Sequence, residues 1–230
     1  MARAVVLHRW PYQESSYIVE FFSESAGRIR AIAKGAKAPK SKWRGVLEPF
    51  QLLQIEHIGR HDLQTLTHAE VEQSFLLRGN YLYSGFYLNE LLQRLLPENF
   101  AAPALFHDYL TTLQLLSEQV LLEPVLRRFE WQLLKGLELD FSFTHDAISQ
   151  AELQPNDYYR FIPEQGFVAV HDRVLETDFM GHEIAKLARF EFADERALRR
   201  YKQLMRMALQ PYLGNKPLQS RNLFKVTNSR

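Results

Sequence analysis

The chain contains no cysteine among its 230 residues. Disulfides, thiolate metal sites, iron–sulfur clusters and cysteine nucleophiles are therefore excluded. It also lacks an uncharged apolar run near the roughly 18 residues that a membrane-spanning helix requires. The first residues, MARAVVLHRWPYQ, show no long apolar core and no small-residue cleavage site. We therefore expect a soluble cytoplasmic protein.

The common catalytic and nucleotide-binding motifs are also absent. The sequence has no G-x-x-x-x-G-K-[ST], G-x-G-x-x-G, G-x-S-x-G or H-E-x-x-H. His57, His61 and His68 surround one predicted hairpin, but no carboxylate or thiolate completes a metal-ligand spacing. The sequence thus predicts no catalytic residue, no metal site and no cofactor, and a protein that is not an enzyme.

The composition is that of a globular protein, with 46% hydrophobic and 24% charged residues. The net charge of +1 conceals a segregated distribution. Residues 1–80 have a net charge of +3, residues 81–192 of −9 and residues 193–230 of +7. This asymmetry points to a polyanion partner at one or both ends, unless the basic ends neutralise the acidic middle within the fold.

Residues 1–77 have the short, alternating pattern of β-structure. A long connection of small and basic residues, 35–45, separates the third strand candidate from the fourth. The five candidates are Ala2–Arg9, Ser16–Phe22, Arg28–Lys34, Phe50–Ile58 and Leu63–Phe75. Because closure removes the exposed edges of a small sheet, we expect a five-stranded barrel. The strand count fits an oligonucleotide-binding (OB) fold, with an SH3-like barrel as the alternative.

From residue 81 the apolar positions follow the helical period of 3.6 residues. Helices are predicted at Leu88–Leu95, Ala104–Ser117, Pro124–Leu137, Thr177–Phe190 and Asp194–Leu213. A β-hairpin is predicted near 158–170, and Gly214–Arg230 is a polar, basic end. The sequence therefore predicts an α+β protein of two domains, a barrel over residues 1–78 and a mainly helical domain over residues 79–230.

The strongest local signal is an uninterrupted basic stretch with an aromatic residue inside it. Its members are Arg28, Arg30, Lys34, Lys37, Lys40, Lys42, Trp43 and Arg44. Alternation places Arg28, Arg30 and Lys34 on one strand face, and the others on the loop that follows. Cations on a barrel can follow the phosphates of a single strand while an aromatic ring stacks on a base. We therefore predict that these residues bind DNA, the alternative being a solvated loop with Trp43 packed inward.

Further candidates lie elsewhere in the chain. Additional stacking candidates are Trp10, Tyr12 and Tyr17. A candidate secondary DNA-binding set near the carboxyl end is Arg199, Lys202, Arg206, Lys216 and Arg221. The first three share a helix face, which could equally be solvated or pair with the acidic middle. Arg127 lies on an apolar helix face with Trp131, where an arginine usually has a carboxylate partner inside the fold.

Segments along nearly the whole chain resemble the RecO family of recombination mediators. In the barrel region they are Leu7-His8-Arg9, Glu14-Ser15-Ser16, Phe21 to Arg28, Ala33-Lys34-Gly35-Ala36-Lys37 and Gly45 to Phe50. In the helical region they are Tyr87 to Leu92, Leu126 to Leu134 and Tyr212 to Arg221. The A-K-G-A-K segment followed by L-x-P-F is the most specific of these.

The resemblance implies an OB barrel followed by a helical domain, and a non-enzymatic role in the RecF pathway of recombinational DNA repair. Members bind single-stranded and double-stranded DNA and anneal complementary strands coated with single-stranded DNA-binding protein. They also engage RecR and help to load RecA, so a place at the nucleoid follows. Carried over, the DNA contacts would be Arg28, Arg30, Lys34, Lys37 and Lys40. Arg127 and Trp131 would hold the acidic, Phe-terminated tail of the single-stranded DNA-binding protein.

The chain departs from the family pattern at two places. Some members have a four-cysteine zinc motif in the second domain, so here the 140–170 region must fold without it. Relatives often read Leu-Gly-Tyr after the central helix, whereas this chain reads Leu137-Glu138-Leu139, and we expect that helix to end differently. Two other functions stay open: a protein adaptor whose basic barrel binds an acidic partner, and a metal-dependent nucleic-acid enzyme.

Overall fold

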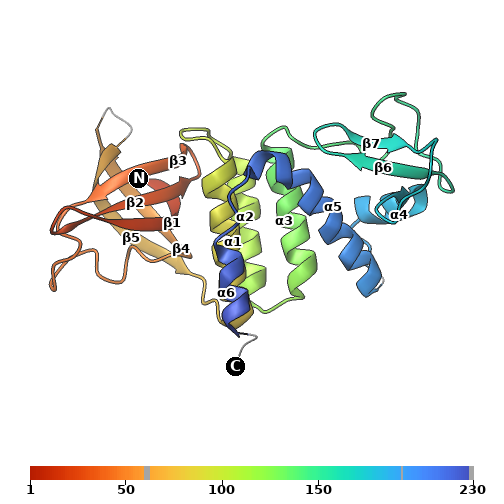
Figure 1. Ribbon diagram of the computed structural model, residues 1–230. Coiled ribbons are helices and arrows are strands. Elements are labelled where there is room, and N and C mark those ends of the chain that lie inside the picture. The colour runs from red at the N-terminus through yellow and green to blue at the C-terminus, as the bar shows by residue number, and fades with distance from the viewer. Residues whose placement is uncertain (60–62, 193, 228–230) are drawn as a thin grey trace. The chain divides into compact units, whose positions relative to one another are not determined.

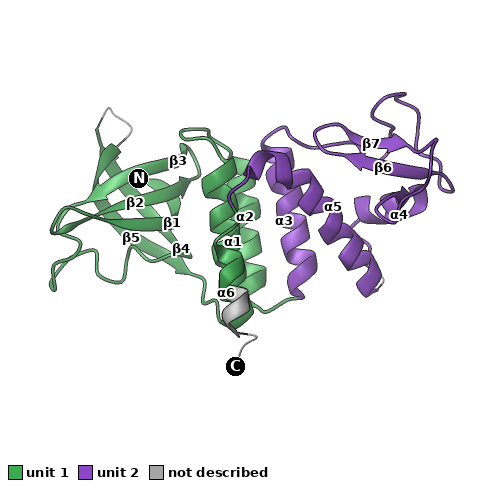
Figure 2. Ribbon diagram, in the orientation of Figure 1, with its two compact units in different colours: residues 1–120, 217–230 green, residues 121–216 purple. Residues whose placement is uncertain are grey.

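The computed structural model divides into two compact units (Figures 1 and 2). It describes residues 1–59, 63–192 and 194–227, apart from the side chains of 224–227. Unit 1 comprises residues 1–120 and 217–230, and unit 2 comprises residues 121–216. Strands give way to helices near residue 78, as predicted, but the helices that follow directly belong to the same unit as the strands. No helix of the described residues is long and apolar enough to cross a lipid bilayer.

Five strands of unit 1 form a closed barrel in the order β1-β2-β3-β5-β4. They are β1 (Ala2–Tyr12), β2 (Ser16–Ser23), β3 (Gly27–Ala33), β4 (Gln51–Ile58) and β5 (Leu63–Ser74). Strand β1 also pairs with β4, and the only parallel pairing among the described strands joins β3 to β5. This is the order of an OB fold, so the OB prediction is confirmed and the SH3-like alternative is wrong.

The barrel interior follows the alternation predicted for the third strand. Ile29, Ala31 and Ala33 are buried inside, whereas the residues between them face outward. Trp43 and Leu47, from the connection between β3 and β4, belong to the same buried cluster. Residues of the β3–β4 connection therefore complete the core of the barrel. Their packing holds this connection against the barrel.

Three helices complete unit 1: α1 (Gly79–Leu95), α2 (Pro103–Ser117) and α6 (Ser220–Thr227). Helix α1 is fixed to the barrel by Asn89, whose side-chain amide donates a 2.9 Å hydrogen bond to the Leu7 carbonyl. Helix α6 was not predicted, because its residues read as a polar end. It begins against Glu90 of α1, whose carboxylate accepts from the backbone amides of Gln219 and Ser220 at 2.9 Å each. A carboxylate on another helix thus caps α6.

Unit 2 contains α3 (Leu122–Gly136), β6 (Tyr158–Ile162), β7 (Gly166–Ala169), β8 (Phe179–Met180), α4 (Gly181–Ala188) and α5 (Glu195–Leu213). Helix α3 ends at Gly136 with Leu137 as its C-cap, and Glu138 takes a left-handed backbone conformation with a φ of 59°. The amide of Glu138 bonds to the carbonyl of Lys135, and the amide of Leu139 to that of Leu134. This is the Schellman arrangement that glycine usually adopts. Glu138 occupies the position of the glycine in the relatives' Leu-Gly-Tyr pattern, and whether the helix ends differently from theirs stays a prediction.

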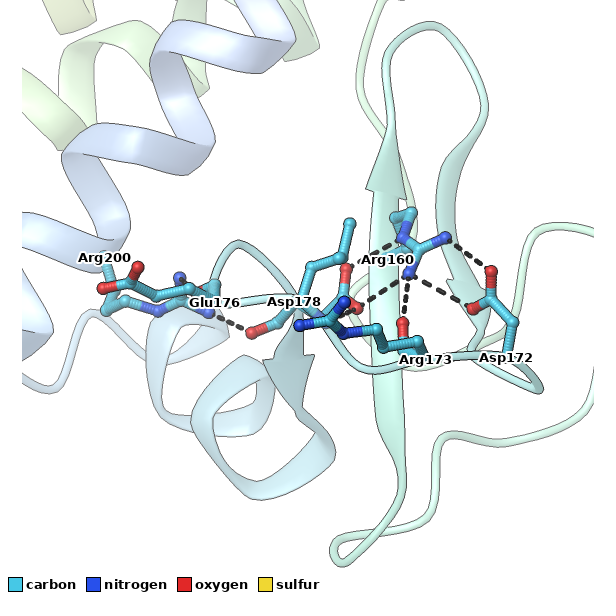
Figure 3. Close-up of polar contacts among 7 residues, drawn as sticks. Arg160, Asp172, Arg173, Glu176, Asp178 and Arg200 are labelled. Carbon is cyan, nitrogen blue, oxygen red and sulfur yellow. Dashed lines mark hydrogen bonds and ion pairs between the residues drawn. The ribbon is translucent and has the colours of Figure 1, made fainter.

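The 140–180 region is held by buried carboxylates and packed aromatic rings. The Asp178 carboxylate accepts two 3.0 Å hydrogen bonds from the Arg160 guanidinium, which also contacts Asp172 (Figure 3). Arg200 of α5 donates to the carbonyls of Glu176 and Asp178 (Figure 3). Asp146 accepts from three backbone amides, those of Ile148, Ser149 and Ala169. An aromatic cluster packs beside them, formed by Trp131, Phe141, Phe143, Phe161 and Phe167.

Candidate nucleic-acid interface

The two arginines of β3 are bound to carboxylates of unit 1. Arg28 donates to Glu20 at 2.6 Å and to the Leu96 carbonyl at 2.8 Å, and its side chain is mostly buried. Arg30 forms an ion pair with Glu98, which follows α1. The α1–α2 connection therefore covers the first half of β3. Because carboxylates of unit 1 pair with both arginines, the proposed DNA contacts rest on the other cations of the basic stretch, and a DNA-binding role of Arg28 and Arg30 stays a prediction.

A glycine makes this covering possible. Gly27 precedes Arg28 and has a φ of 69°, which favours glycine. A Cβ atom added there would lie 1.9 Å from the Phe100 carbonyl oxygen. The adjoining amide of Asn99 donates a 2.9 Å hydrogen bond to the Arg28 carbonyl. The α1–α2 connection thus lies directly against the backbone at the start of β3.

The loop cations differ from the strand cations in their partners. The loop set is defined as Lys34, Lys37, Lys40, Lys42 and Arg44. None of the five has a carboxylate within 4.0 Å among the residues that the structure describes. Four are exposed and Lys37 is half-buried. The loop set therefore presents uncompensated positive charge to solvent.

Two members of the loop set, Lys37 and Lys42, are held by backbone carbonyls of other segments. The Lys37 amide donates to the Ser15 carbonyl at 2.9 Å, and its ammonium to the Gln13 carbonyl at 2.7 Å. The Lys42 ammonium donates to the Thr67 carbonyl at 2.8 Å on β5. The Lys37 bonds hold the loop against the β1–β2 turn, and the Lys42 bond holds it against β5. OB folds bind oligonucleotides through their strand 2–3 face and the loop between strands 1 and 2, so this location fits a nucleic-acid surface.

Trp43 does not lie on that surface. Its side chain is 4% exposed, and its indole nitrogen donates a 3.0 Å hydrogen bond to the Lys34 carbonyl. Trp43 thus closes the barrel, as in the alternative of an inward-packed ring, and cannot stack on a base in this conformation. Among the other stacking candidates, Trp10 is exposed, and Tyr12 and Tyr17 are half-buried.

The carboxy-terminal basic set is divided between the two units. Arg199 pairs with Glu195 at 3.1 Å and Lys202 with Glu123 at 2.5 Å. Arg206 is exposed on α5, and Lys216 ends unit 2. Arg221 belongs to unit 1 instead. Two members of this set are thus paired with acids, as the alternative reading of the sequence held, and the secondary DNA-binding role stays a prediction.

The candidate site for a partner's tail is occupied by a buried ion pair. The Arg127 guanidinium lies 2.8 Å from the Glu130 carboxylate, and both side chains are almost completely buried. Trp131 packs against the rings of Phe141 and Phe143. Burial, reinforced by the charge of Glu130, raises the pKa of the neighbouring Tyr201 hydroxyl. Arg127 is therefore satisfied inside unit 2, and this arrangement gives no support to a role as receptor for a terminal carboxylate.

No group of three or more metal-ligating side chains is found in the described part of the chain. His61, one of the three clustered histidines, lies outside the described residues. Sequence reasoning missed a different feature, a cleft beside the loop set to which Arg9 and Tyr17 contribute. Arg9 is far from the loop set in the sequence. The pairing of β1 with β2 places it beside the cleft.

Comparison with known proteins covers both parts of the chain. Residues 1–75 match the family described as Recombination protein O N terminal, and residues 77–222 match Recombination protein O C terminal. The chain is 49% identical over 228 residues to the DNA repair protein RecO of Idiomarina loihiensis, covering 98% of this chain and 97% of that protein. It is 41% identical to the protein of that name from Vibrio cholerae (99% and 94% covered) and 43% to that from Haemophilus influenzae (97% and 95%).

Proposed function

The chain belongs to the RecO family of DNA repair proteins, and we propose that it acts as a DNA-binding recombination mediator without catalysing a reaction. It would bind single-stranded and double-stranded DNA and anneal complementary strands in the RecF pathway. The observation that supports this most directly is the loop set, five cations on an OB barrel without carboxylate partners among the described residues.

The chemistry of annealing fits such a surface. Two DNA strands repel each other through their phosphates, and cations that replace the counterions lower that repulsion. Phosphate contacts carry no sequence information, so the same surface serves any pair of complementary strands. Annealing needs no nucleophile and no proton transfer. A charged, exposed loop on a closed barrel therefore suits annealing.

The partners follow from the family. We propose that the protein acts on strands coated with single-stranded DNA-binding protein, engages that protein's acidic tail and RecR, and so helps to load RecA. The buried Arg127–Glu130 pair removes the basis for placing the tail at Arg127. The tail contact is therefore proposed for the protein as a whole and not for that residue.

Annealing of fluorescently labelled complementary oligonucleotides tests the proposal. The strands are coated with single-stranded DNA-binding protein, either intact or without its acidic tail. We expect annealing of strands coated with the intact protein, and loss of annealing when the tail is removed. The variant Lys34→Gln/Lys40→Gln/Arg44→Gln should anneal at least about tenfold more slowly.

The matched control removes the same charge elsewhere. Arg128, Lys135 and Arg196 are exposed in unit 2, and changing all three to glutamine should leave annealing intact. Absence of annealing of bare and coated strands at low salt would contradict the mediator proposal. Salt-sensitive binding of an acidic protein without retention on DNA would favour the adaptor instead. Metal-dependent cleavage of the labelled strands would favour an enzyme.

A further inference from the structure

A cleft of about 330 Å³ lies beside the loop set, between β1, β2 and the connection that leads to β4. Its walls include Arg9, Tyr17, Lys37, Pro39, Arg44 and Leu47. Small-molecule pockets usually measure about 300–1,000 Å³, so the cleft is of a size that suits one nucleotide. Apolar and aromatic groups meet cations in this cleft, a combination that suits a base joined to a phosphate.

The wall around Tyr17 is built from fixed groups. The Arg9 guanidinium lies 5.2 Å from the centre of the Tyr17 ring, and the Lys37 ammonium lies 5.6 Å from it. Arg9 is held by Glu48 at 2.8 Å and by the Leu47 carbonyl at 3.2 Å. Glu48 thereby neutralises Arg9 and orients its guanidinium plane. Aromatic rings and guanidinium planes are the surfaces on which unstacked bases lie.

Besides the paired Arg9 and Glu48, the cleft is lined by two further charged side chains. Lys37 and Arg44 belong to the loop set and have no carboxylate partner among the described residues. The Lys37 ammonium donates to the Gln13 carbonyl, and the Arg44 guanidinium donates to the Pro39 carbonyl at 3.4 Å. A phosphate is the anion that accompanies a base in DNA, and it would find two cations here.

We propose that this cleft holds a single unstacked nucleotide of a DNA strand. The base lies against Tyr17 and Arg9, and its phosphate lies between Lys37 and Arg44. The inference rests on the proposed DNA binding and goes further, because it gives the surface a preference for single strands. A base in a duplex is stacked and paired and must be extruded before it can enter a pocket, whereas an unpaired base enters freely.

The test compares wild type and variants of the protein on two DNA probes, one with bases and one without. Fluorescence anisotropy of the full-length protein measures affinity for a thymidine oligonucleotide and for an abasic oligomer of equal length and charge. Wild type should prefer the oligonucleotide with bases by about fivefold or more. In Tyr17→Leu, which keeps apolar volume but removes the ring, the preference should fall to within twofold. Lys40→Gln, outside the cleft, should weaken both probes equally.

A second variant guards against misfolding, because Tyr17 packs on the barrel core. Ala38 is exposed on the cleft wall, and Ala38→Gln should close the cleft without touching the core and abolish the same preference. If wild type shows no preference, or if both variants keep it, bases are not held in this cleft and the inference fails while DNA binding stands. If neither probe binds at low salt, the proposed function itself fails.

Discussion

Glu20 accepts a 2.6 Å hydrogen bond from Arg28, although the strand register places Phe22 opposite Arg28. Glu20 is 2% exposed and also accepts a 2.7 Å hydrogen bond from Gln93 of α1. Its buried charge therefore depends on donors from β3 and from a helix. The Arg28–Glu20 pair belongs to the framework that joins the barrel to α1, and this distinguishes it from the cations of the loop set.

Replacing Arg28 should affect folding and not DNA binding. Arg28→Gln leaves the buried Glu20 carboxylate without its cation, which should cost about 3 kcal/mol of unfolding free energy in urea titrations. Single-stranded DNA affinity of the folded variant should change less than twofold. The double variant Glu20→Gln/Arg28→Gln should recover part of the stability. A variant as stable as wild type that no longer binds DNA would show that strand arginines contact the nucleic acid.

Arg127 should likewise behave as a structural residue of unit 2. Arg127→Met removes the cation that lies 2.8 Å from the buried Glu130 carboxylate. The free energy of unfolding of unit 2 should fall by about 3 kcal/mol. Hydrogen exchange should quicken across residues 121–216 and stay unchanged in the barrel. Arg128→Met, exposed on the same helix, is the matched control. Selective loss of tail binding with wild-type exchange rates would restore Arg127 as a tail receptor.

Asp178 should make unit 2 sensitive to acid. Burial would raise its pKa, but hydrogen bonds from Arg160 and from the Leu175 amide, with the charge of Arg160, hold the pKa of this carboxyl below its usual value. A lowered pKa stabilises the fold above the unfolded value of about 3.9, and this stability is lost as pH falls through the folded pKa. Asp178→Asn should therefore cost about 2 kcal/mol at pH 7 and progressively less below about pH 4.

The control for this prediction is Asp172→Asn, because Asp172 contacts the same arginine while 70% exposed. Asp172→Asn should change the free energy of unfolding little at any pH. Urea titrations of wild type and both variants from pH 3 to pH 7 give the comparison. A difference between wild type and Asp178→Asn that is the same at every pH would mean that the carboxylate charge contributes nothing.

Glu90 should control the order of α6. Burial would raise its pKa, but the amides of Ser220 and Gln219 and the Ser220 hydroxyl outweigh this and lower it. Glu90→Ala should remove this cap and speed hydrogen exchange at residues 219–223 about tenfold. Glu118→Ala removes the same charge from an exposed position and should leave that segment unchanged. Protection of α6 that survives Glu90→Ala would mean that packing against α1 alone orders it.

The barrel was predictable because its signals are local. Alternation along β3 separates Ile29, Ala31 and Ala33 from the outward residues, and this division depends only on the period of a strand. Helix α6 was not predictable in this way. Its first backbone amides donate to Glu90, which lies about 130 residues earlier in the chain. The residues of the segment itself therefore do not indicate the helix cap.

The basic stretch was predictable from the sequence. Which of its cations pair with acids in the fold was not. Arg30 and Lys34 are both cations of the same stretch, and the sequence does not distinguish them. In the fold Arg30 forms an ion pair with Glu98, which lies 68 residues further along the chain, and Lys34 does not. Burial of Trp43 likewise depends on where the connection crosses the barrel. Spacing identifies which residue types occur together, whereas partners brought from distant segments decide which charges are available.

The salt dependence of single-stranded DNA binding tests the central claim most directly, that the loop set holds the phosphates. The logarithm of affinity is measured against the logarithm of salt concentration for a thymidine oligonucleotide. Each phosphate contact on a single strand contributes a slope of about −0.7, so Lys34→Gln/Lys40→Gln/Arg44→Gln should reduce the slope by about 2 in magnitude. The variant Arg128→Gln/Lys135→Gln/Arg196→Gln should keep the wild-type slope. A loop-set variant with wild-type slope and affinity would contradict the account.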